Sequence, residues 1–553
     1  MNAPLVWDTQ RRSRAARLSR AQPLANGKHV AATQIGALLR ALIEPGDRVC
    51  LEGNNQKQAD FLARALNELD PTAVSGLHLL MSVLALPEHL DLFENGIASR
   101  IDFSFSGPQS LRLARLVAEG RIEIGAIHTY LELYARYFVD LTPNVALICA
   151  QAADREGNLY TGANTEDTPA IVEATAFKSG IVVAQVNEVL DVLPRVDIPA
   201  GWVDFVVQSP QPHFIEPLFT RDPAQIGEIQ VLMAMMAIKG IYARYGVQRL
   251  NHGIGFDTAA IELLLPTYGD SLGLKGRICQ HWALNPHPAL IPAIEAGWVK
   301  SVHSFGSEIG MERYIGARPD VFFTGADGSM RSNRAMCQAA GHYACDLFIG
   351  STLQIDMAAN SSTATLGRIA GFGGAPNMGA DARGRRHGSP AWLQAGREAR
   401  QGLAGAAGTP RGQKLVVQMV ETFREHMQPA FVERLDAWQL AEQARMPLPP
   451  IMIYGDDVSH ILTEEGIANL LLCRSDEERE QAVRGVAGYT PAGLGRDRRM
   501  VENLRDRGIV QRPEDIGVDA RLATRNLLAA RSMRDLVDAS GGLYAPPARF
   551  RNW

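Results

Sequence analysis

The sequence has few cysteines, no long apolar run and no excess of positive charge. Its 553 residues include 6 cysteines, and no two of them form the C-x-x-C pair typical of zinc and redox sites. No apolar stretch reaches the roughly 18–20 residues that span a bilayer. The net charge of -5 provides no basic field to hold nucleic acid or an anionic membrane. We therefore expect a reduced, soluble, cytoplasmic protein with no nucleic-acid or membrane partner.

Hydrophobic residues make up 46% of the chain and charged residues 21%, which excludes a disordered, collagen-like or coiled-coil protein. The N-terminal segment is locally basic, with Arg11, Arg12, Arg14, Arg17 and Arg20. No apolar region follows these arginines, so the segment is not a secretory signal. We expect it to be a solvated tail, with docking to a partner as the alternative.

A weak internal repeat indicates two related units. Residues 48–66 and 248–266 each contain a short apolar run, a glycine (Gly53 or Gly253), a few polar or small residues and then apolar positions at helical spacing. This is the pattern of a strand, a glycine turn and a helix, written twice. The alternative is coincidence, because any α/β protein contains such units.

Apolar runs and amphipathic segments alternate along the chain. Residues 145–152 and 180–189 are rich in β-branched residues, as expected of parallel strands buried on both faces. Residues 110–120 and 289–297 are predicted helices that end at glycine, and residues 347–357 are a candidate strand. The alternation predicts an α/β fold of open, largely parallel sheets with flanking helices.

A proline-rich stretch at 215–230 interrupts this pattern and is the candidate domain boundary. We predict an N-terminal domain over residues 1–225 and a C-terminal domain over residues 226–553.

The glycine turns are the candidate reaction site. Glycine lets backbone N–H groups approach a ligand closely, and such groups at a helix start can hold an anion or the oxyanion of a thioester under attack. No serine, cysteine or histidine nucleophile is evident beside them. The predicted catalytic residues are Gly53, Asn54, Asn55, Gly253 and Gly255, and the predicted substrate contacts are Gln56, His252 and Asn285.

A second glycine-rich stretch is followed by a basic segment. Residues 371–414 contain seven Lys or Arg and two acids (Asp381 and Glu398), a local charge of +5. The segment is either a solvated face or a surface that receives an anionic group. The candidate residues for the second role are Gly371, Gly373, Gly374, Asn377, Arg383, Arg385 and Arg386.

Other common site motifs are missing. Gly253-Ile254-Gly255 lacks the third glycine of a dinucleotide fingerprint, because Thr258 stands in its place. His281 and His287 have no carboxylate placed nearby in the sequence to complete a metal site, so no metal is predicted and we expect hydrogen-bonding or core histidines.

An ordered set of motifs resembles the family I coenzyme A transferases. Residues 251–255 match the glycine motif that opens their second domain, and 371–374 their late glycine turn. The first-domain signature is matched by 154–159, 176–178 and 185–188, and the C-terminal segment by 458–468. Over essentially its whole length the chain is similar to the α subunits of biotin-independent malonate decarboxylase, and more distantly to those of citrate lyase.

The resemblance implies two coenzyme A transferase-like domains that face each other across the active site. It also implies an activity, in which acetyl-S-carrier and malonate give malonyl-S-carrier and acetate. The expected partners are an acyl carrier protein subunit and decarboxylase subunits of one complex. No cofactor is expected on the chain itself, since the reacting thiol ends the phosphoribosyl-dephospho-coenzyme A arm of the carrier.

One departure concerns the family's glutamate nucleophile. The corresponding stretch here is 281–285, which has no glutamate, and Glu94-Asn95-Gly96 lies in the wrong half of the chain. We therefore expect malonate itself to attack the thioester and form a mixed anhydride. The alternatives are a transferase or hydrolase acting on free coenzyme A, and a non-catalytic scaffold subunit.

Overall fold

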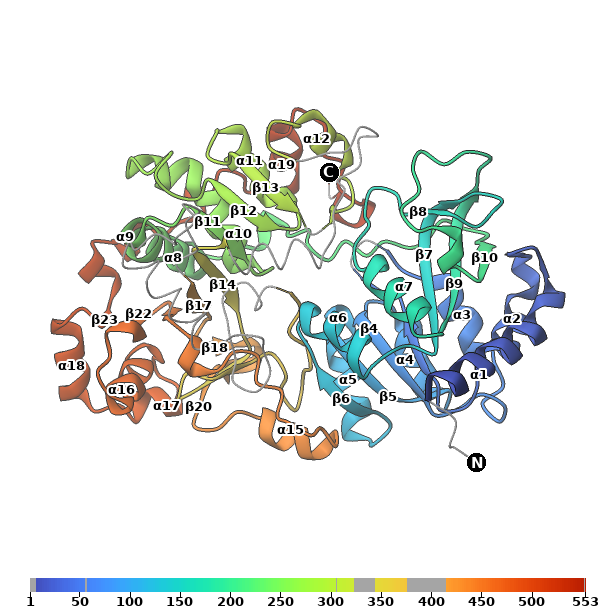
Figure 1. Cartoon of the computed structure of the whole chain (residues 1–553). Helices are drawn as coiled ribbons and strands as arrows, with labels where there is room; N and C mark the ends of the chain where they lie inside the picture. Colours follow the sequence, from blue (N-terminus) through green and yellow to red (C-terminus); the bar gives the residue numbers. More distant parts are fainter. Residues whose placement is uncertain (1–5, 55–56, 305, 323–343, 375–413, 552) are drawn as a thin grey trace, which may run out of the picture.

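The computed structural model of the chain describes residues 6–54, 57–304, 306–322, 344–374, 414–551 and 553. Two β-sheets, one from each half of the chain, lie on opposite sides of the molecule, each with its own helices (Figure 1). Their strands fall within residues 25–208 and 249–511. The predicted boundary at 225/226 lies between these two ranges and stays a prediction.

The first sheet contains ten strands among the described residues, in the order β1-β2-β10-β9-β7-β3-β4-β5-β6, with β8 paired to β7. All neighbours are parallel except the pairs β1–β2 and β7–β8. The strands are β1 (Ala25–Asn26), β2 (His29–Val30), β3 (Arg48–Leu51), β4 (Leu77–Val83), β5 (Ala98–Phe105), β6 (Glu123–Ile127), β7 (Val145–Ala153), β8 (Leu159–Tyr160), β9 (Ile181–Val189) and β10 (Phe205–Gln208).

Helices cover both faces of this sheet. Successive side chains of a strand point to opposite sides, and here both sets are apolar and buried. In β3, Val49 and Leu51 belong to the core under α2–α5, whereas Cys50 belongs to the core under α6 and α7. The helices of the first half are α1 (Val6–Ala21), α2 (Ile35–Leu42), α3 (Asp60–Asn67), α4 (Pro87–Glu94), α5 (Ser110–Ala118), α6 (Tyr130–Val139) and α7 (Thr168–Phe177).

The second sheet contains eight strands among the described residues, in the order β13-β12-β11-β14-β17-β21-β22-β23. The neighbours from β13 to β21 are parallel, and β22 and β23 pair antiparallel at one edge. The strands are β11 (Arg249–His252), β12 (His281–Leu284), β13 (Ser301–Ser304), β14 (Leu347–Ser351), β17 (Leu415–Met419), β21 (His460–Thr463), β22 (Gly466–Asn469) and β23 (Val510–Gln511).

Helices also pack on the second sheet, and short strands lie beside it. The core on one face includes Leu250, Trp282 and Ile349 together with residues of α8, α10, α11 and α19. The remaining strands are β15 (Gln354–Asp356), β16 (Ser361–Ser362), β18 (Phe423–Arg424), β19 (Gln428–Pro429) and β20 (Phe431–Val432). The helices are α8 (Glu228–Met236), α9 (Ala243–Tyr245), α10 (Phe256–Leu264), α11 (Ile291–Glu295), α12 (Glu312–Ala317), α15 (Ala437–Gln443), α16 (Asp476–Val486), α17 (Pro491–Leu494), α18 (Arg498–Asp506) and α19 (Met533–Ala539).

The predicted α/β architecture of largely parallel sheets is confirmed, and so is the repeat. The first copy forms β3 and α3, and the second forms β11 and α10. The single strand predicted at 347–357 is instead two strands, β14 and β15, which belong to different sheets. Within the described ranges, every helix is too short or too polar to cross a membrane.

The N-terminal basic segment is not a solvated tail, and this prediction was wrong. It forms α1, which packs against the first half of the chain (Figure 1). Arg17 is buried, and its guanidinium donates to both carboxylate oxygens of Asp47 and to Glu44. Arg14 pairs with Asp204. A buried guanidinium requires such partners, and they lie 27 or more residues away, where the local sequence gives no sign of them.

Replacing Arg17 with alanine leaves the buried Asp47 carboxylate without its cation. We expect a loss of about 3 kcal/mol in the free energy of unfolding, the usual result of breaking a buried pair. The measurement is the thermal unfolding midpoint. Arg12→Ala is the matched control, because Arg12 is exposed and its ion-pair partner among the described residues is Asp8 on the same helix. Equal midpoints for the two variants would show that the Arg17 pair does not stabilise the fold.

Candidate active site

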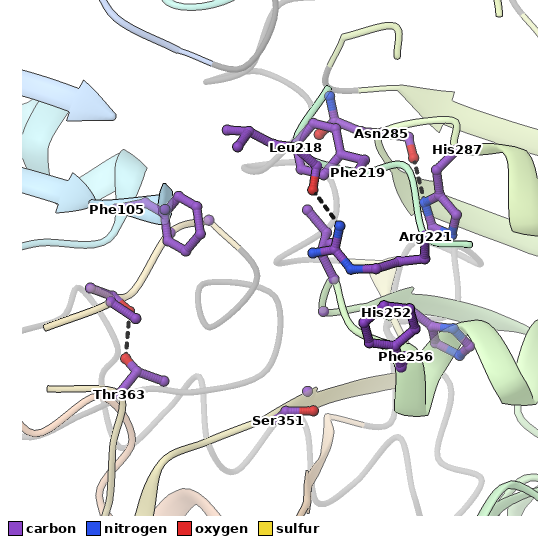
Figure 2. A pocket seen from close by; sticks show the side chains of 18 of the residues that line it. Phe105, Leu218, Phe219, Arg221, His252, Phe256, Asn285, His287, Ser351 and Thr363 are labelled. Carbon is purple, nitrogen blue, oxygen red and sulfur yellow. Dashed lines mark hydrogen bonds between the residues drawn. The ribbon is translucent and has the colours of Figure 1, made fainter. Parts of the chain in front are cut away.

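A cavity of about 610 Å³ lies between the two halves of the chain. Phe105 lines it from the first half, and His252 and Asn285 line it from the second (Figure 2). Tyr130 and Gly253 also line it. Ligands of open α/β sheets bind outside the carboxyl ends of parallel strands, and β5, β11 and β12 end here. This is the junction at which the sequence predicts the active site.

Backbone hydrogen bonds join the two halves beside the cavity. The N–H groups of Phe372 and Gly373 donate to the carbonyl of Ser104, at 2.6 and 2.9 Å. The N–H of Ser106 donates to Ala370 O at 2.9 Å, and the N–H of Tyr130 donates to Gly373 O at 3.2 Å. We call residues 369–373, together with 104–106 and 129–130, the junction seam. The seam fixes the position of the predicted glycine turn against the end of β5.

Gly371 makes this approach possible. Its φ of +82° is in the left-handed region, and a Cβ there would lie 2.4 Å from Ser104 O. Gly373 also has a positive φ, +67°, but a Cβ there would meet nothing within 4 Å. Gly371, Gly373 and Gly374 all line the cavity. Because the N–H groups of Phe372 and Gly373 donate to Ser104, these two groups hold the seam together rather than an anion.

The turn after β11 packs tightly against the neighbouring strand. The N–H of Gly253 donates to Ile349 O at 2.7 Å, and a Cβ on Gly253 would lie 3.0 Å from the Cα of Gly350. Gly255 has an extended backbone and directly precedes α10, which begins at Phe256. Gly253 lines the cavity, and Gly255 lies next to it. The close contact between β11 and β14 is therefore one physical reason for glycine at 253.

Three side chains near the end of β11 form a buried group that we call the imidazole–carboxylate clasp. Glu262 Oε1 lies 2.9 Å from His252 Nδ1, and Glu262 Oε2 lies 2.6 Å from His287 Nε2. His252 Nε2 lies 2.8 Å from the hydroxyl of Tyr242, and His287 Nδ1 lies 3.0 Å from the carbonyl of Asn285. All three clasp side chains are at least nine-tenths buried.

The charges in the clasp follow from its geometry. Burial would raise the pKa of Glu262, but the attraction and hydrogen bonds of His287 and His252 outweigh it and lower this pKa to about 2. For His287, burial opposes the charged form, but Glu262 outweighs it and the pKa is raised. Burial lowers the pKa of His252. The clasp therefore favours a glutamate anion, the protonated form of His287 and the neutral form of His252.

The first predicted glycine turn, which follows β3, is buried. Gly53 and Asn54 are among the described residues, yet neither lines this cavity. A Cβ on Gly53 would lie 2.7 Å from Val83 O, and Asn54 Nδ2 donates to Asp167 at 2.8 Å. The neighbouring Glu166 does reach the second half, where a Cβ on Gly306 would fall 1.8 Å from Glu166 Oε1. The roles predicted for Gly53 and Asn54 stay predictions.

Several predicted residues lie outside the described part of the chain. They are Asn55, Gln56, Asn377, Arg383, Arg385 and Arg386.

The carboxylates that line the cavity in the described residues are Glu216 and Asp222, and both are engaged. Glu216 pairs with Arg549 at 2.7 Å, and Asp222 accepts from the N–H of Ala224 at 2.9 Å. Glu94, from the Glu-Asn-Gly motif, lies on α4 and pairs with Arg112. Among the described residues, no cluster of His, Cys, Asp or Glu could hold a metal ion.

Sequence reasoning missed two further groups, one in the clasp and one at the cavity wall. Glu262 sits within the apolar pattern of α10 and gave no separate signal. Arg221 lines the cavity, and its guanidinium donates to the carbonyls of Leu218 and Thr220. It lies in the proline-rich stretch at 215–230, for which the sequence predicted only a domain boundary. The prediction that His287 is a hydrogen-bonding or core histidine is confirmed, because it is buried and bonds Asn285 and Glu262.

Comparisons with known proteins define first the class of protein and then the family. The alpha subunit of citrate lyase from Streptococcus mutans has the same fold at 15% identity, with 94% of this chain and 87% of that chain covered and a TM-score of 0.56. An acyl-CoA transferase from Escherichia coli O157:H7 has it at 15% identity, with 81% and 89% covered and a TM-score of 0.50. The chain therefore has a coenzyme A transferase-like fold.

The family model described as "Malonate decarboxylase, alpha subunit, transporter" matches residues 6–553. The chain is 61% identical, over 100% of both chains, to the acetyl-S-ACP:malonate ACP transferase of Malonomonas rubra. It is 62% identical to a chain in the crystal structure of a Pseudomonas malonate decarboxylase hetero-tetramer in complex with malonate, with both chains fully covered and a TM-score of 0.91. The chain belongs to the malonate decarboxylase alpha-subunit family. The predicted fold, family and transferase class are confirmed.

Gly371→Ala tests the junction seam. An alanine there combines a left-handed backbone with a Cβ 2.4 Å from Ser104 O, so the two halves must separate locally. Gly373→Ala is the matched control, because an alanine there meets no neighbouring atom. It is destabilised only by its left-handed backbone, by about 1–2 kcal/mol. We expect Gly371→Ala to lower both the unfolding midpoint and the turnover further than Gly373→Ala does. Equal effects in calorimetry and in the transfer assay would contradict a structural role for the seam.

Proposed function

We propose that this chain transfers an acyl carrier protein between two acids, converting acetyl-S-carrier and malonate into malonyl-S-carrier and acetate. The observation that carries the proposal is the full-length 61% identity to a transferase of that name. A cavity between two coenzyme A transferase-like halves supports it, because two acyl partners must meet there.

The reaction proceeds through a mixed anhydride. A carboxylate oxygen of malonate attacks the acetyl carbonyl of the thioester, and the carrier thiolate leaves. The thiolate then attacks the malonyl carbonyl of the acetic–malonic anhydride, and acetate leaves with the bonding electrons. This route is supported by the engaged state of Glu216 and Asp222, which are the carboxylates lining the cavity in the described residues.

The protein's contribution is to orient two acyl groups and to stabilise successive oxyanions. Thioester is exchanged for thioester, so the reaction needs little net driving force. The partners are the carrier subunit and decarboxylase subunits, in an assembly like the Pseudomonas hetero-tetramer. The chain itself holds no cofactor, and the phosphoribosyl-dephospho-coenzyme A arm enters with the carrier as substrate.

The direct test is a transfer assay. Purified chain is mixed with acetyl-carrier and malonate, and the mass of the carrier is followed. We expect malonyl-carrier and acetate in equal amounts, and no covalent enzyme intermediate. Borohydride treatment of enzyme incubated with acetyl-carrier should leave every glutamate intact in peptide mapping, and a reduced glutamate at one position would overturn the direct-anhydride route.

Two other outcomes of the assay distinguish the remaining functions. Faster turnover with acetyl-coenzyme A than with acetyl-carrier would favour a transferase of free coenzyme A. Absence of product with both donors, from a folded chain supplied with its partner subunits, would favour a scaffold subunit.

The basic segment after the glycine turn is proposed to contact a phosphate of the carrier arm. The local charge of +5 over residues 371–414 supports this assignment. We expect the combined change of Arg383, Arg385 and Arg386 to glutamine to raise the Michaelis constant for carrier and flatten its dependence on salt. The control is the same change at Arg498 and Arg499 on α18, two residues outside the cavity lining. An unchanged Michaelis constant for carrier would show that the segment is a solvated face.

A further inference from the structure

We infer that Arg221 binds the carboxylate of malonate that does not react, and that it thereby makes the cavity selective for a dicarboxylic acid. The inference rests on the proposed function and adds to it the residue that recognises the substrate. The carboxylate bound by Arg221 is the one that stays free in malonyl-carrier, while the other carboxylate attacks the acetyl thioester.

Arg221 is a half-buried cation at the cavity wall. Its Nη1 atom donates to the carbonyls of Leu218 and Thr220, at 2.7 and 3.0 Å. Among the described residues these are its hydrogen bonds, and it has no acidic partner there within ion-pair distance. Its Nε and Nη2 atoms, which form one edge of the guanidinium, are therefore left for a ligand. Neither belongs to the buried side-chain atoms that lack a partner, so this edge is accessible from the cavity.

Two other arginines line the cavity in the described part of the chain, and they differ from Arg221. Arg549 pairs with Glu216 at 2.7 Å and donates to the carbonyl of Pro217 at 3.2 Å. The Nε atom of Arg368 is buried and has no partner, so the Nε edge of that guanidinium does not open onto the cavity. Of the three, Arg221 is the one whose Nε and Nη2 atoms are both available to a ligand.

The charge of Arg221 favours an anion beside it. Burial lowers the pKa of Arg221, Glu308 raises it and Arg549 lowers it. The Glu308 carboxylate accepts from the N–H and the hydroxyl of Thr220, at 3.2 and 2.8 Å, and does not pair directly with the guanidinium. Because arginine keeps its proton in proteins, the cost of burying this cation is offset when a ligand supplies a negative charge.

The protein holds the guanidinium in position before a ligand binds. The carbonyl of Thr220 accepts from Nη1, and Thr220 is itself fixed by the fully buried Glu308. The ring of Phe256 packs against the other side, with its centroid 5.6 Å from Arg221 Cζ. In Figure 2 the side chain of Arg221 extends toward Phe105 on the opposite side of the cavity. The edge is therefore preorganised and points into the cavity.

The shape of this edge fits a carboxylate. Its two parallel N–H donors match the two oxygens of a carboxylate in a bidentate pair. Phe256, which packs against Arg221, directly follows the 253–255 turn that the sequence predicts to be part of the acyl site. One methylene separates the two carboxyl groups of malonate. A malonate held at Arg221 therefore places its second carboxylate beside this turn.

Binding at Arg221 distinguishes malonate from a monocarboxylic acid. Malonate supplies one carboxylate to Arg221 and the other to the thioester. Acetate has only the carboxylate that reacts, so it leaves the guanidinium without a partner. Malonyl-carrier keeps its free carboxylate, so Arg221 contacts the malonyl group both before and after transfer.

The test compares Arg221→Gln and Arg221→Lys with Arg525→Gln, each in the complex with its partner subunits. Arg525 is the matched control, since it is also half-buried and donates to backbone carbonyls, those of Pro223 and Arg531, but does not line the cavity. Malonate binding is measured by titration calorimetry. Transfer from acetyl-carrier is measured with malonate and, as an exchange reaction, with isotopically labelled acetate.

We expect Arg221→Gln to weaken malonate binding and lower kcat/KM for malonate by about 10- to 100-fold, the ratio that a hydrogen bond to a charged group supplies. The acetate exchange rate and the Michaelis constant for carrier should not change. Arg221→Lys should lie between Arg221→Gln and the wild type, because an ammonium keeps the charge but lacks the bidentate edge. Arg525→Gln should match the wild type.

Circular dichroism and the unfolding midpoint establish that each variant is folded. A folded Arg221→Gln variant that binds and transfers malonate like the wild type overturns the inference and leaves the proposed function in place. Equal losses with malonate and acetate also overturn it, and so does a loss confined to the Michaelis constant for carrier, which would assign the edge to a phosphate of the carrier arm. Malonate binding that depends on Arg221, in a wild-type complex that makes no malonyl-carrier, supports the contact and overturns the proposed function.

Discussion

The structure depends on the hydrogen bonds by which residues 369–373 dock against the end of β5. These residues belong to the second half of the chain, yet their backbone pairs with Ser104, Ser106 and Tyr130 of the first half. Backbone N–H and C=O groups buried at such a junction must be paired, so the two halves cannot separate here without cost. The cavity is the space that this docking encloses between two sheets whose strand ends face each other.

The electrostatics of the cavity follow from the rule that buried charges require partners. Glu262 is an anion because His287 and His252 surround it, and Glu216 is paired with Arg549. Each of these carboxylates is hydrogen-bonded or ion-paired to a neighbouring side chain. Among the described residues, the carboxylates that line the cavity both have partners, Glu216 in Arg549 and Asp222 in the N–H of Ala224. This composition suits a reaction in which the substrate's own carboxylate attacks.

The two halves share an architecture and differ in their polar groups. In the first half, the turn after β3 lies over a buried network in which Lys57 is 3.4 Å from Glu52 and Asn54 bonds Asp167. In the second half, the turn after β11 lies beside the imidazole–carboxylate clasp and opens onto the cavity. The repeat therefore places equivalent strand ends, and the side chains around each turn decide what each can do.

The sequence by itself determined the α/β class, the repeat at Gly53 and Gly253, and the family, because these depend on local periodicity and on ordered motifs. It also indicated His252, Gly253 and Asn285. Only the tertiary structure decided that Arg17 is buried, that Gly371 meets Ser104, and that Glu262 joins His252 to His287. These pairs are separated by 30, 267, 10 and 25 residues. Such contacts arise from how strands and helices pack, and no local pattern records that packing.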